Sequence, residues 1–586
     1  MCGIVGIITE NAKDYHSTVS KMCKTLHHRG PDDSGIVCFD NAIIAHTRLS
    51  IVDIEGGFQP KKVGSVGVTF NGEIYGYQDL KKQFSNYNFE SESDTELLFA
   101  LYETFGFQMC KHLPGMFAFG IWDDKKQSLL CGRDRFGEKP LFYAYGRSGE
   151  FIFSSEIKAI ISSGLLDVSF DNDNLSHYLQ YLYTHPSKTI YKNIYPVLPG
   201  NILIYDKKGV SQKRYWEFPK INTERSYLDS ISTFKSLFNN AIKKQLIADV
   251  EVGAFLSGGL DSSTVVAVAK QFSPSLKTFS FKFREHFDET KYASQIAEKY
   301  QTDHYELHDD QDIGELIVKM QEVYDEPFAD SSNIATYLIS KCAKNYVDVV
   351  LTGDGADELL GGYSWYKNLY HMNPFQSVLS GVFQFFNVCG PFREGTRLYR
   401  RWKHDFQRAH LSQKRYFSLE ECHTLFEKNI NLNHFEPTSQ NTLEGILEED
   451  VTNYMVGDIL VKTDRAAMAH SLELRAPFLD KDVAEFCFSL PFDHKVTFFQ
   501  DKRLLRDTFG DLWTPDIRNR PKQGFGAPVN TWLELPSVKG LVHDFLEKKS
   551  APIYNIFDFN TVRPYLNHNN YHKWTLLVLS VWMATR

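Results

Sequence analysis

One stretch of this 586-residue chain has the residue types and order of a phosphate-binding loop. The run Ser257-Gly258-Gly259-Leu260-Asp261-Ser262-Ser263 follows a short apolar stretch typical of a buried strand, and a helical pattern then continues to residue 270. Glycines let the backbone approach an anion closely, and the amides at a helix start point toward it. The stretch therefore predicts contact with nucleotide phosphates, although it lacks the GK[ST] of a Walker A loop. An ordinary turn rich in Ser and Gly is the competing interpretation.

Cys2 is a candidate nucleophile at the start of the chain. If Met1 is removed, Cys2 carries both a thiol and a free α-amine. The pKa of an α-amine is about 7.7–8.0, so a useful fraction is unprotonated at neutral pH and can accept the thiol proton. One residue would then supply nucleophile and base. The competing interpretation is a small buried hydrophobic cysteine.

A second strand end carries a run of acidic residues. The apolar run at 347–351 leads into Thr352-Gly353-Asp354-Gly355-Ala356-Asp357-Glu358. Because the carboxyl ends of parallel strands meet at one edge of a sheet, we expect this run to lie near the phosphate loop. A Gly/Asp-rich loop that only caps a helix is the competing interpretation.

The pattern of apolar residues predicts the elements that position these groups. Strands are expected at 277–283, 304–307 and 347–351, and they alternate with helices near 226–246, 290–299, 313–324 and 335–344. That alternation predicts a parallel sheet covered on both faces. In the first half, strands are expected at 35–39, 42–51, 66–70, 117–122, 128–131, 141–145 and 151–154, with helices near 14–27 and 94–105.

The strand pattern fades between residues 202 and 219, where Asp206-Lys207-Lys208-Gly209 forms a charged turn. We take this stretch as the boundary between a domain at 1–210 and a domain at 211–586, since the chain is too long for one core.

Composition excludes several classes of protein. A net charge of −9 argues against a nucleic-acid or anionic-membrane surface. Nine scattered cysteines without CxxC pairs indicate reduced thiols in a cytoplasmic protein rather than a zinc site or disulfide framework. No 18-residue apolar run is present, which predicts no membrane insertion.

Together the SGGLDSS run and the first residues resemble the glutamine-hydrolysing asparagine synthetases. In these enzymes an N-terminal-nucleophile glutaminase domain is fused to an ATP-pyrophosphatase synthetase domain. The matching N-terminal blocks are 28–32, 48–53, 70–75 and 93–94. The resemblance covers nearly the whole chain apart from about 364–450, and it implies an α+β αββα sandwich followed by an α/β parallel-sheet domain.

The resemblance assigns roles in the first domain. Cys2 would form a γ-glutamyl thioester and release ammonia. The side-chain amide of Asn71 and the backbone N–H of Gly72 would form the oxyanion hole. Arg48 would pair with the glutamine α-carboxylate, while Glu73 and Asp94 would hold its α-ammonium. The implied glutamine-binding residues are Arg48, Ile51, Val52, Glu73 and Asp94.

It also assigns roles in the second domain. Asp261 and Asp357 would hold Mg²⁺ on the pyrophosphate of ATP, and Lys502 would reach the phosphates. Asp354 would act in catalysis where many relatives have Glu, and Asp288 would lie near the acceptor's amine. The implied ATP-binding residues are Leu256, Ser257, Gly258, Gly259, Asp261, Ser262, Ser263, Thr352 and Gly353.

The implied reaction joins the two halves: a carboxylate is activated as an acyl-adenylate, and ammonia then displaces AMP. The leading acceptor is L-aspartate. Because Asp325–Ser332 differs from the Thr/Arg-rich segment of the best-known bacterial type, a uronic-acid sugar or its nucleotide conjugate remains an alternative. A third hypothesis is a non-catalytic protein with a degenerate site. The resemblance also implies an ammonia tunnel and pairing as a homodimer.

Overall fold

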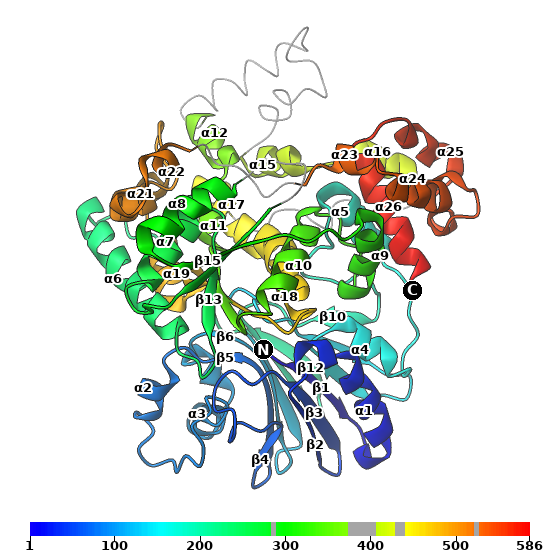
Figure 1. Ribbon diagram of the computed structural model, residues 1–586. Helices are drawn as coiled ribbons and strands as arrows, with labels where there is room; N and C mark the ends of the chain where they lie inside the picture. The colour runs from blue at the N-terminus through cyan, green and yellow to red at the C-terminus, as the bar shows by residue number, and fades with distance from the viewer. Residues whose placement is uncertain (283–288, 373–405, 428–439, 521–526) are drawn as a thin grey trace.

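A computed structural model describes residues 1–282, 289–372, 406–427, 440–520 and 527–586. Figure 1 shows two parts: antiparallel sheets formed by the first part of the chain, and above them a helix-covered parallel sheet. The N-terminus lies where the two parts meet (Figure 1). No helix among these residues is both long and apolar enough to cross a membrane.

The first part contains two six-stranded antiparallel sheets that pack face to face. Their strand orders are β10-β8-β9-β1-β3-β2 and β12-β11-β7-β6-β5-β4. Apolar side chains of both sheets interdigitate between them, for example Ile4 and Ile44 of one sheet with Trp122 and Leu203 of the other. The strands are β1 (Gly3–Ile8), β2 (Asp33–Cys38), β3 (Ala42–Arg48), β4 (Lys61–Val63), β5 (Val66–Glu73), β6 (Met116–Asp123), β7 (Ser128–Arg133), β8 (Phe142–Tyr145), β9 (Phe151–Ser154), β10 (Ile194–Pro196), β11 (Asn201–Asp206) and β12 (Gly209–Arg214).

Helices cover the outer face of each sheet. One sheet packs against α1 and α4, and the other against α3 through Val68, Phe70 and Leu97. The predicted αββα sandwich is thereby confirmed. The helices of this part are α1 (His16–Thr25), α2 (Tyr77–Lys81), α3 (Leu97–Phe105), α4 (Ile157–Ser162) and α5 (Asn172–Tyr181).

The stretch between residues 202 and 219, where the strand pattern fades in the sequence, contains a β-hairpin. Strand β11 pairs with β7 and with β12, and the charged turn at Asp206 to Gly209 joins β11 to β12. The alternation in β12 is weak because its residues are exposed or only half-buried, which is why periodicity suggested a fading pattern. The antiparallel sheet therefore extends to Arg214.

The second part is built on a five-stranded parallel sheet with the order β15-β14-β13-β16-β17. All four strand pairs are parallel, as the alternation of strands and helices predicts. Ala254 and Leu351 pack under helices on one face, and Phe279 and Val350 on the other. The strands are β13 (Val252–Phe255), β14 (Lys277–Phe281), β15 (Asp303–Leu307), β16 (Val349–Leu351) and β17 (Glu473–Arg475).

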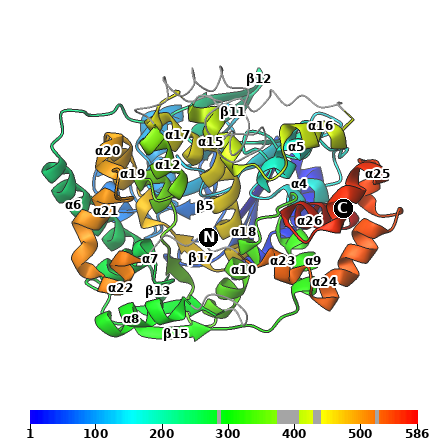
Figure 2. The same cartoon turned by 90° about the horizontal axis from the view of Figure 1, so that it is seen from above.

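Helices surround this sheet and continue to the C-terminus, as the view from above also shows (Figure 2). They are α6 (Tyr227–Gln245), α7 (Leu260–Ala269), α8 (Thr290–Tyr300), α9 (Ile313–Val323), α10 (Ser332–Ala343), α11 (Ala356–Leu360), α12 (Ser364–Met372), α15 (Phe406–Lys414), α16 (Leu419–Leu425), α17 (Leu443–Glu449), a π-helix at Asp450–Ile459, α18 (Leu460–Met468), α19 (Lys481–Phe488), α20 (Phe492–Lys495), α21 (Arg503–Phe509), α22 (Pro515–Asn519), α23 (Val529–Trp532), α24 (Pro536–Val542), α25 (Phe559–Val562) and α26 (Tyr571–Ala584).

Buried ion pairs join the two parts. The guanidinium of Arg29 donates to both carboxylate oxygens of Asp464, at 2.8 and 3.0 Å, and to Glu156 at 2.8 Å. The α-ammonium of Met1 lies 2.8 Å from Glu473 Oε2. Since breaking such a pair leaves an uncompensated buried charge, these contacts fix how the antiparallel-sheet and parallel-sheet parts sit against each other.

Candidate active site

A cavity of about 550 Å³ opens at the carboxyl edge of the parallel sheet. Loops that follow β13 and β16 line it, as the topology requires of strands that run in one direction. Its volume falls in the range of small-molecule sites. The implied ATP-binding residues at this cavity are Leu256, Ser257, Gly258, Gly259, Asp261, Ser262, Thr352 and Gly353. Ser263 is fully buried and does not line it.

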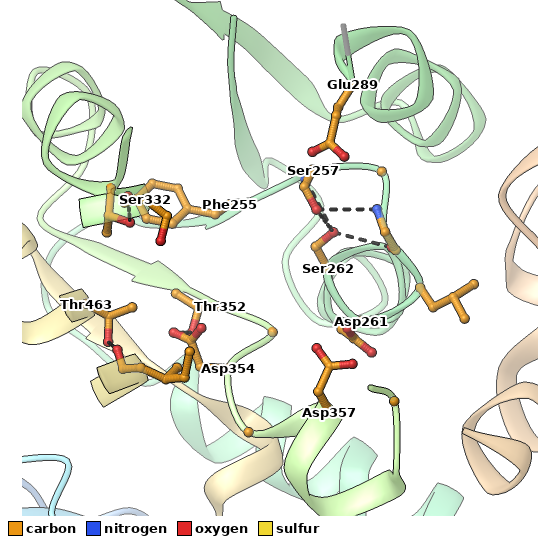
Figure 3. Close-up of a pocket in the computed structure, with 18 of the residues that line it drawn as sticks. Phe255, Ser257, Asp261, Ser262, Glu289, Ser332, Thr352, Asp354, Asp357 and Thr463 are labelled. Carbon is orange, nitrogen blue, oxygen red and sulfur yellow. Dashed lines mark hydrogen bonds between the residues drawn. The ribbon is translucent and has the colours of Figure 1, made fainter. Parts of the chain in front are cut away.

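The loop after β13 leads directly into the start of α7 (Figure 3). Gly258 has φ of 68°, and a Cβ there would lie 2.4 Å from Tyr292 Cβ, so only glycine fits without strain. Ser257 Oγ accepts from the amide of Gly259 at 3.3 Å and lies 3.1 Å from Ser262 Oγ. The loop thus presents amides and hydroxyls beside the N-terminus of a ten-residue helix, which is the chemistry that binds phosphate.

Two aspartates and one lysine converge beside this loop. Lys502 Nζ lies 2.6 Å from both oxygens of Asp261 and 2.6 Å from Asp357 Oδ1. Burial alone would lower the pKa of Lys502, but the two carboxylates outweigh it and raise that pKa above its ordinary value. The two carboxylates come from different elements and both contact the Lys502 ammonium, so they lie close together. Mg²⁺ takes one or two carboxylates plus phosphate oxygens, and this arrangement of carboxylates fits such an ion. In the described part of the chain, no group of three or more metal-ligating residues forms a self-sufficient metal site.

Asp354 lies between the phosphate loop and a second, smaller cavity. Its Oδ2 accepts a hydrogen bond of 2.8 Å from Thr352 Oγ1, and burial raises the pKa of its carboxyl. In Figure 3, Thr463, Thr352 and Asp354 lie on one side of the cavity, and Asp261 and Asp357 on the other. Asp288 lies outside the described residues.

The smaller cavity, of about 20 Å³, adjoins both Met1 and Asp354. It shares Thr352, Asp354, Thr463 and Leu474 with the large cavity. Its wall is mixed: Leu460 and Ala476 are apolar, whereas Glu138 and Lys139 are ionisable. The smaller cavity therefore lies between Met1 and the wall of the large cavity.

At the N-terminus the structure brings Cys2 and Asn71 together. The backbone N–H of Cys2 donates to Asn71 Oδ1 at 2.9 Å, and Asn71 Nδ2 is buried without a protein acceptor in the described residues. Gly72 follows in β5, where a Cβ would lie 2.1 Å from Met116 O. Burial raises the pKa of the Cys2 thiol, although the neighbouring α-ammonium lowers it.

The implied glutamine-binding residues surround this corner. Arg48 is nearly buried, and its guanidinium donates to the carbonyls of Asp53 at 2.6 Å and Ile54 at 2.9 Å. Ile51 is buried and Val52 follows it in the same loop. Burial raises the pKa of Glu73, and it raises that of Asp94 to about 6. The carboxyl groups of Glu73 and Asp94, both with raised pKa values, thus lie among the implied glutamine-binding residues.

Several residues at these sites had no role assigned from sequence. Arg475 donates to Glu473 Oε1 at 2.7 Å and lies 3.5 Å from Glu73, so it links β17 to the glutamine-side carboxylates. Asp330 and Lys462 line the large cavity and pair at 2.8 Å. Asp330 lies in the 325–332 stretch that already bears on the choice of acceptor, and Lys462 and Arg475 lie in blocks that resemble family segments. No individual role could be assigned to them, because a single charged residue is common on any surface.

Comparisons with known proteins cover the entire chain. The glutamine amidotransferase domain model matches residues 1–216, and the asparagine synthase model matches residues 233–584. Asparagine synthetase [glutamine-hydrolyzing] 1 of Bacillus subtilis is 31% identical over 99% of this chain and 96% of its own. Asparagine synthetase [glutamine-hydrolyzing] 3 of the same organism is 30% identical over 94% and 92%, and asparagine synthetase [glutamine-hydrolyzing] 2 of Arabidopsis thaliana is 31% identical over 64% and 63%.

Proposed function

The chain belongs to the asparagine synthase family, and from this premise we propose that it converts L-aspartate to L-asparagine with glutamine as the ammonia source and ATP as the activating substrate. AMP, pyrophosphate and glutamate would be the other products. The observation that carries the proposal is the presence of two sites in one chain: a buried Cys2 beside the Asn71 side-chain amide, and a Ser/Gly loop with two carboxylates and a lysine at the large cavity.

In the glutaminase site Cys2 would attack the amide carbon of glutamine. Removal of Met1 would leave the α-amine of Cys2 beside Asn71 Oδ1, because the Cys2 nitrogen already lies 2.9 Å from that oxygen. The amine would take the thiol proton. Asn71 Nδ2 and the N–H of Gly72 would donate to the oxyanion, and the leaving ammonia would depart from the tetrahedral intermediate.

In the synthetase site the substrate carboxylate would attack the α-phosphorus of ATP. The amides and hydroxyls at 257–262 would bind the phosphates, and Lys502 would offset the charge of the leaving pyrophosphate. Asp261 and Asp357 would hold Mg²⁺, which when bound supplies further positive charge at the phosphates. Ammonia would then attack the acyl-adenylate, and Asp354 would accept a proton from the attacking nitrogen. The proposal is supported by the position of Asp354 in the lining of both cavities and by burial, which raises the pKa of its carboxyl.

Ammonia must reach the adenylate without protonation in bulk water, since ammonium has no lone pair. The smaller cavity supports a passage, because it adjoins Met1 and Asp354 and shares part of its wall with the large cavity. Glu138 and Lys139 line it, but burial raises the pKa of Glu138 and lowers that of Lys139, so both groups shift toward their neutral forms.

The test is pyrophosphate release with ATP, Mg²⁺ and glutamine, comparing L-aspartate with a panel of uronic acids and their nucleotide conjugates. We expect release that depends on aspartate, with asparagine identified by mass. Release that depends on a uronic acid while aspartate stays silent would contradict the aspartate assignment and establish a sugar amidotransferase. Absence of ATP cleavage with every acceptor would contradict the ligase function itself.

A further inference from the structure

The end of the large cavity away from the phosphate loop contains a paired cation and anion. Lys462 Nζ lies 2.8 Å from Asp330 Oδ2, and both side chains are only slightly exposed, at 12% and 19%. Ser332 donates to Asp330 through its amide at 3.0 Å and through its hydroxyl at 2.9 and 2.8 Å. Lys462 extends from the first turn of α18, and Asp330 precedes α10. The start of α18 and the segment just before α10 thus hold opposite charges at one wall of the cavity.

The charge state of this pair is well defined. Burial alone would raise the pKa of Asp330, but Lys462 and Ser332 outweigh it and lower that pKa. Asp458 is buried, and burial together with the charge of Asp330 raises the pKa of its carboxyl. The cavity wall itself presents one anion, Asp330, and one cation, Lys462.

We propose that Asp330 and Lys462 are the specificity-determining pair that binds the α-ammonium and α-carboxylate of an amino-acid acceptor. A zwitterionic head group offers the complementary two charges at adjacent positions, so it can replace the internal pair with two charge-assisted contacts. A uronic acid has a carboxylate but no ammonium, and it would leave Asp330 without a counter-charge. This inference rests on the proposed function and names the residues that choose its acceptor.

The position of the pair fits the direction of the reaction. Lys462 is the charged group that most lowers the pKa of Asp354, so the head-binding wall lies toward Asp354. Thr463, next to Lys462, lines both the large cavity and the smaller one that adjoins Met1. An amino acid held by its head at this wall would extend its side-chain carboxylate between Asp354 and the phosphate loop. One methylene separates that carboxylate from the α-carbon in aspartate.

Aspartate analogues that lack one head charge test the proposal. Succinate lacks the α-ammonium, and β-alanine lacks the α-carboxylate. With ammonia as the nitrogen donor, we measure kcat/KM for pyrophosphate release with each acceptor. Asp330→Asn is expected to lower kcat/KM for aspartate about 10²-fold and that for succinate only a few-fold, because truncating a buried charge partner costs about that much. Lys462→Gln is expected to lower kcat/KM for aspartate about 10²-fold and that for β-alanine only a few-fold, for the same reason.

The chain offers a matched control. Asp309 and Lys341 form an Asp–Lys pair with the same separation of 2.8 Å, and Lys341 lies on α10, but neither residue lines the cavity. Asp309→Asn and Lys341→Gln should therefore leave the ratio of aspartate to succinate and to β-alanine unchanged. KM for ATP should change at most a few-fold in all four variants, since the phosphates bind at the other end of the cavity.

Folding and function are separated by two further measurements. If a single variant leaves a lone buried charge and fails to fold, the double variant Asp330→Asn, Lys462→Gln removes both charges and is expected to fold and to lose both preferences. Equal losses for aspartate and both analogues in a folded variant would overturn the proposal. Wild-type enzyme that does not use aspartate at all would instead contradict the proposed function, so the two failures are distinguishable.

Discussion

Asn71 is placed to perform two tasks with one side chain. Its Oδ1 accepts from the nitrogen of Cys2 at 2.9 Å, and its Nδ2 is buried with no acceptor among the described residues. A buried donor without an acceptor costs about 1–3 kcal/mol, so its retention favours a role in which the acceptor forms during the reaction. The oxyanion of the tetrahedral intermediate is such an acceptor.

Asn71→Ala should therefore lower kcat for glutamine hydrolysis about 10²–10³-fold, with a much smaller change in the glutamine KM. Cys2→Ala is the reference for complete loss of hydrolysis. Ammonia-dependent pyrophosphate release should persist in both variants, because the synthetase site is intact. A large rise in KM with normal kcat would show that Asn71 binds ground-state glutamine and would contradict the oxyanion role.

The carboxyl of Asp94 predicts an acid limit for glutamine use. Burial raises its pKa to about 6, and it must be ionised to hold the α-ammonium of glutamine. The Cys2 α-amine, with a pKa of about 7.7–8.0, sets a first decline of kcat/KM as pH falls. As pH falls through 6 the Asp94 carboxyl also takes up a proton, so the decline should steepen by about a further tenfold per pH unit below 6. A carboxyl with an ordinary pKa would leave the first slope unchanged to about pH 4.

The measurement is kcat/KM for glutamine hydrolysis between pH 5 and 8 in wild type and in Asp94→Asn. The variant should be slower at every pH and should lose the component of the decline that belongs to Asp94. The neighbouring Glu73 also has a raised pKa and can contribute a second limb. A wild-type profile whose slope does not steepen between pH 6 and 5, and that matches the slope of Asp94→Asn, would show that Asp94 does not hold the ammonium.

Among the elements, the turn from β13 to α7 depends most on a single residue type. Gly258 has φ of 68°, and a Cβ would lie 2.4 Å from Tyr292 Cβ and 2.7 Å from the amide nitrogen of Ala293. Gly258→Ala should raise the KM for ATP about tenfold or more. The loop must shift away from α8, and its backbone amides then no longer point at the phosphates.

Gly164→Ala is the matched control for that substitution. Gly164 has a similar φ of 70°, but a Cβ there meets nothing within 4 Å. It should cost about 1–2 kcal/mol of stability from the left-handed backbone alone and leave the KM for ATP unchanged. Thermal unfolding and ATP kinetics of both variants decide the matter, and equal ATP KM values would refute the steric argument.

The elements that carry strong periodicity are the ones that sequence predicts well. The helix expected at 313–324 is α9 (Ile313–Val323), and the strand expected at 304–307 is β15 (Asp303–Leu307). Strand β17 (Glu473–Arg475) was not expected, because three residues give no period and it pairs with β16 only after the intervening segment has packed. The edge strand β12 was missed because its side chains alternate too weakly.

Across the whole molecule, the family could be predicted from local runs, because the SGGLDSS stretch and the N-terminal blocks each carry their own chemistry, whereas the roles of single residues in them stay predictions. The pairs that join the two parts could not be predicted, since Arg29 and Asp464 are 435 residues apart and Met1 and Glu473 are 472 apart. Only tertiary packing brings such groups together, and each alone is an unremarkable charge. The same holds for Asp330, which lies just before α10, and Lys462 of α18, which meet at the cavity wall.

The proposed coupling between the two sites is a property of the whole molecule, and Ala476 tests it. Ala476 is buried, and it lines the small cavity but not the large one. The small cavity has room for about one water-sized molecule, so the longer side chain in Ala476→Leu should obstruct the proposed passage at a stability cost of about 1–3 kcal/mol. Asparagine formed per glutamine hydrolysed should then fall several-fold, while hydrolysis itself and synthesis from added ammonia stay near wild type, because ammonia from solution enters the synthetase site directly.

The ammonia-supported rate is the internal control for folding. If the variant keeps wild-type stoichiometry, ammonia travels by another route and the small cavity has no part in the coupling.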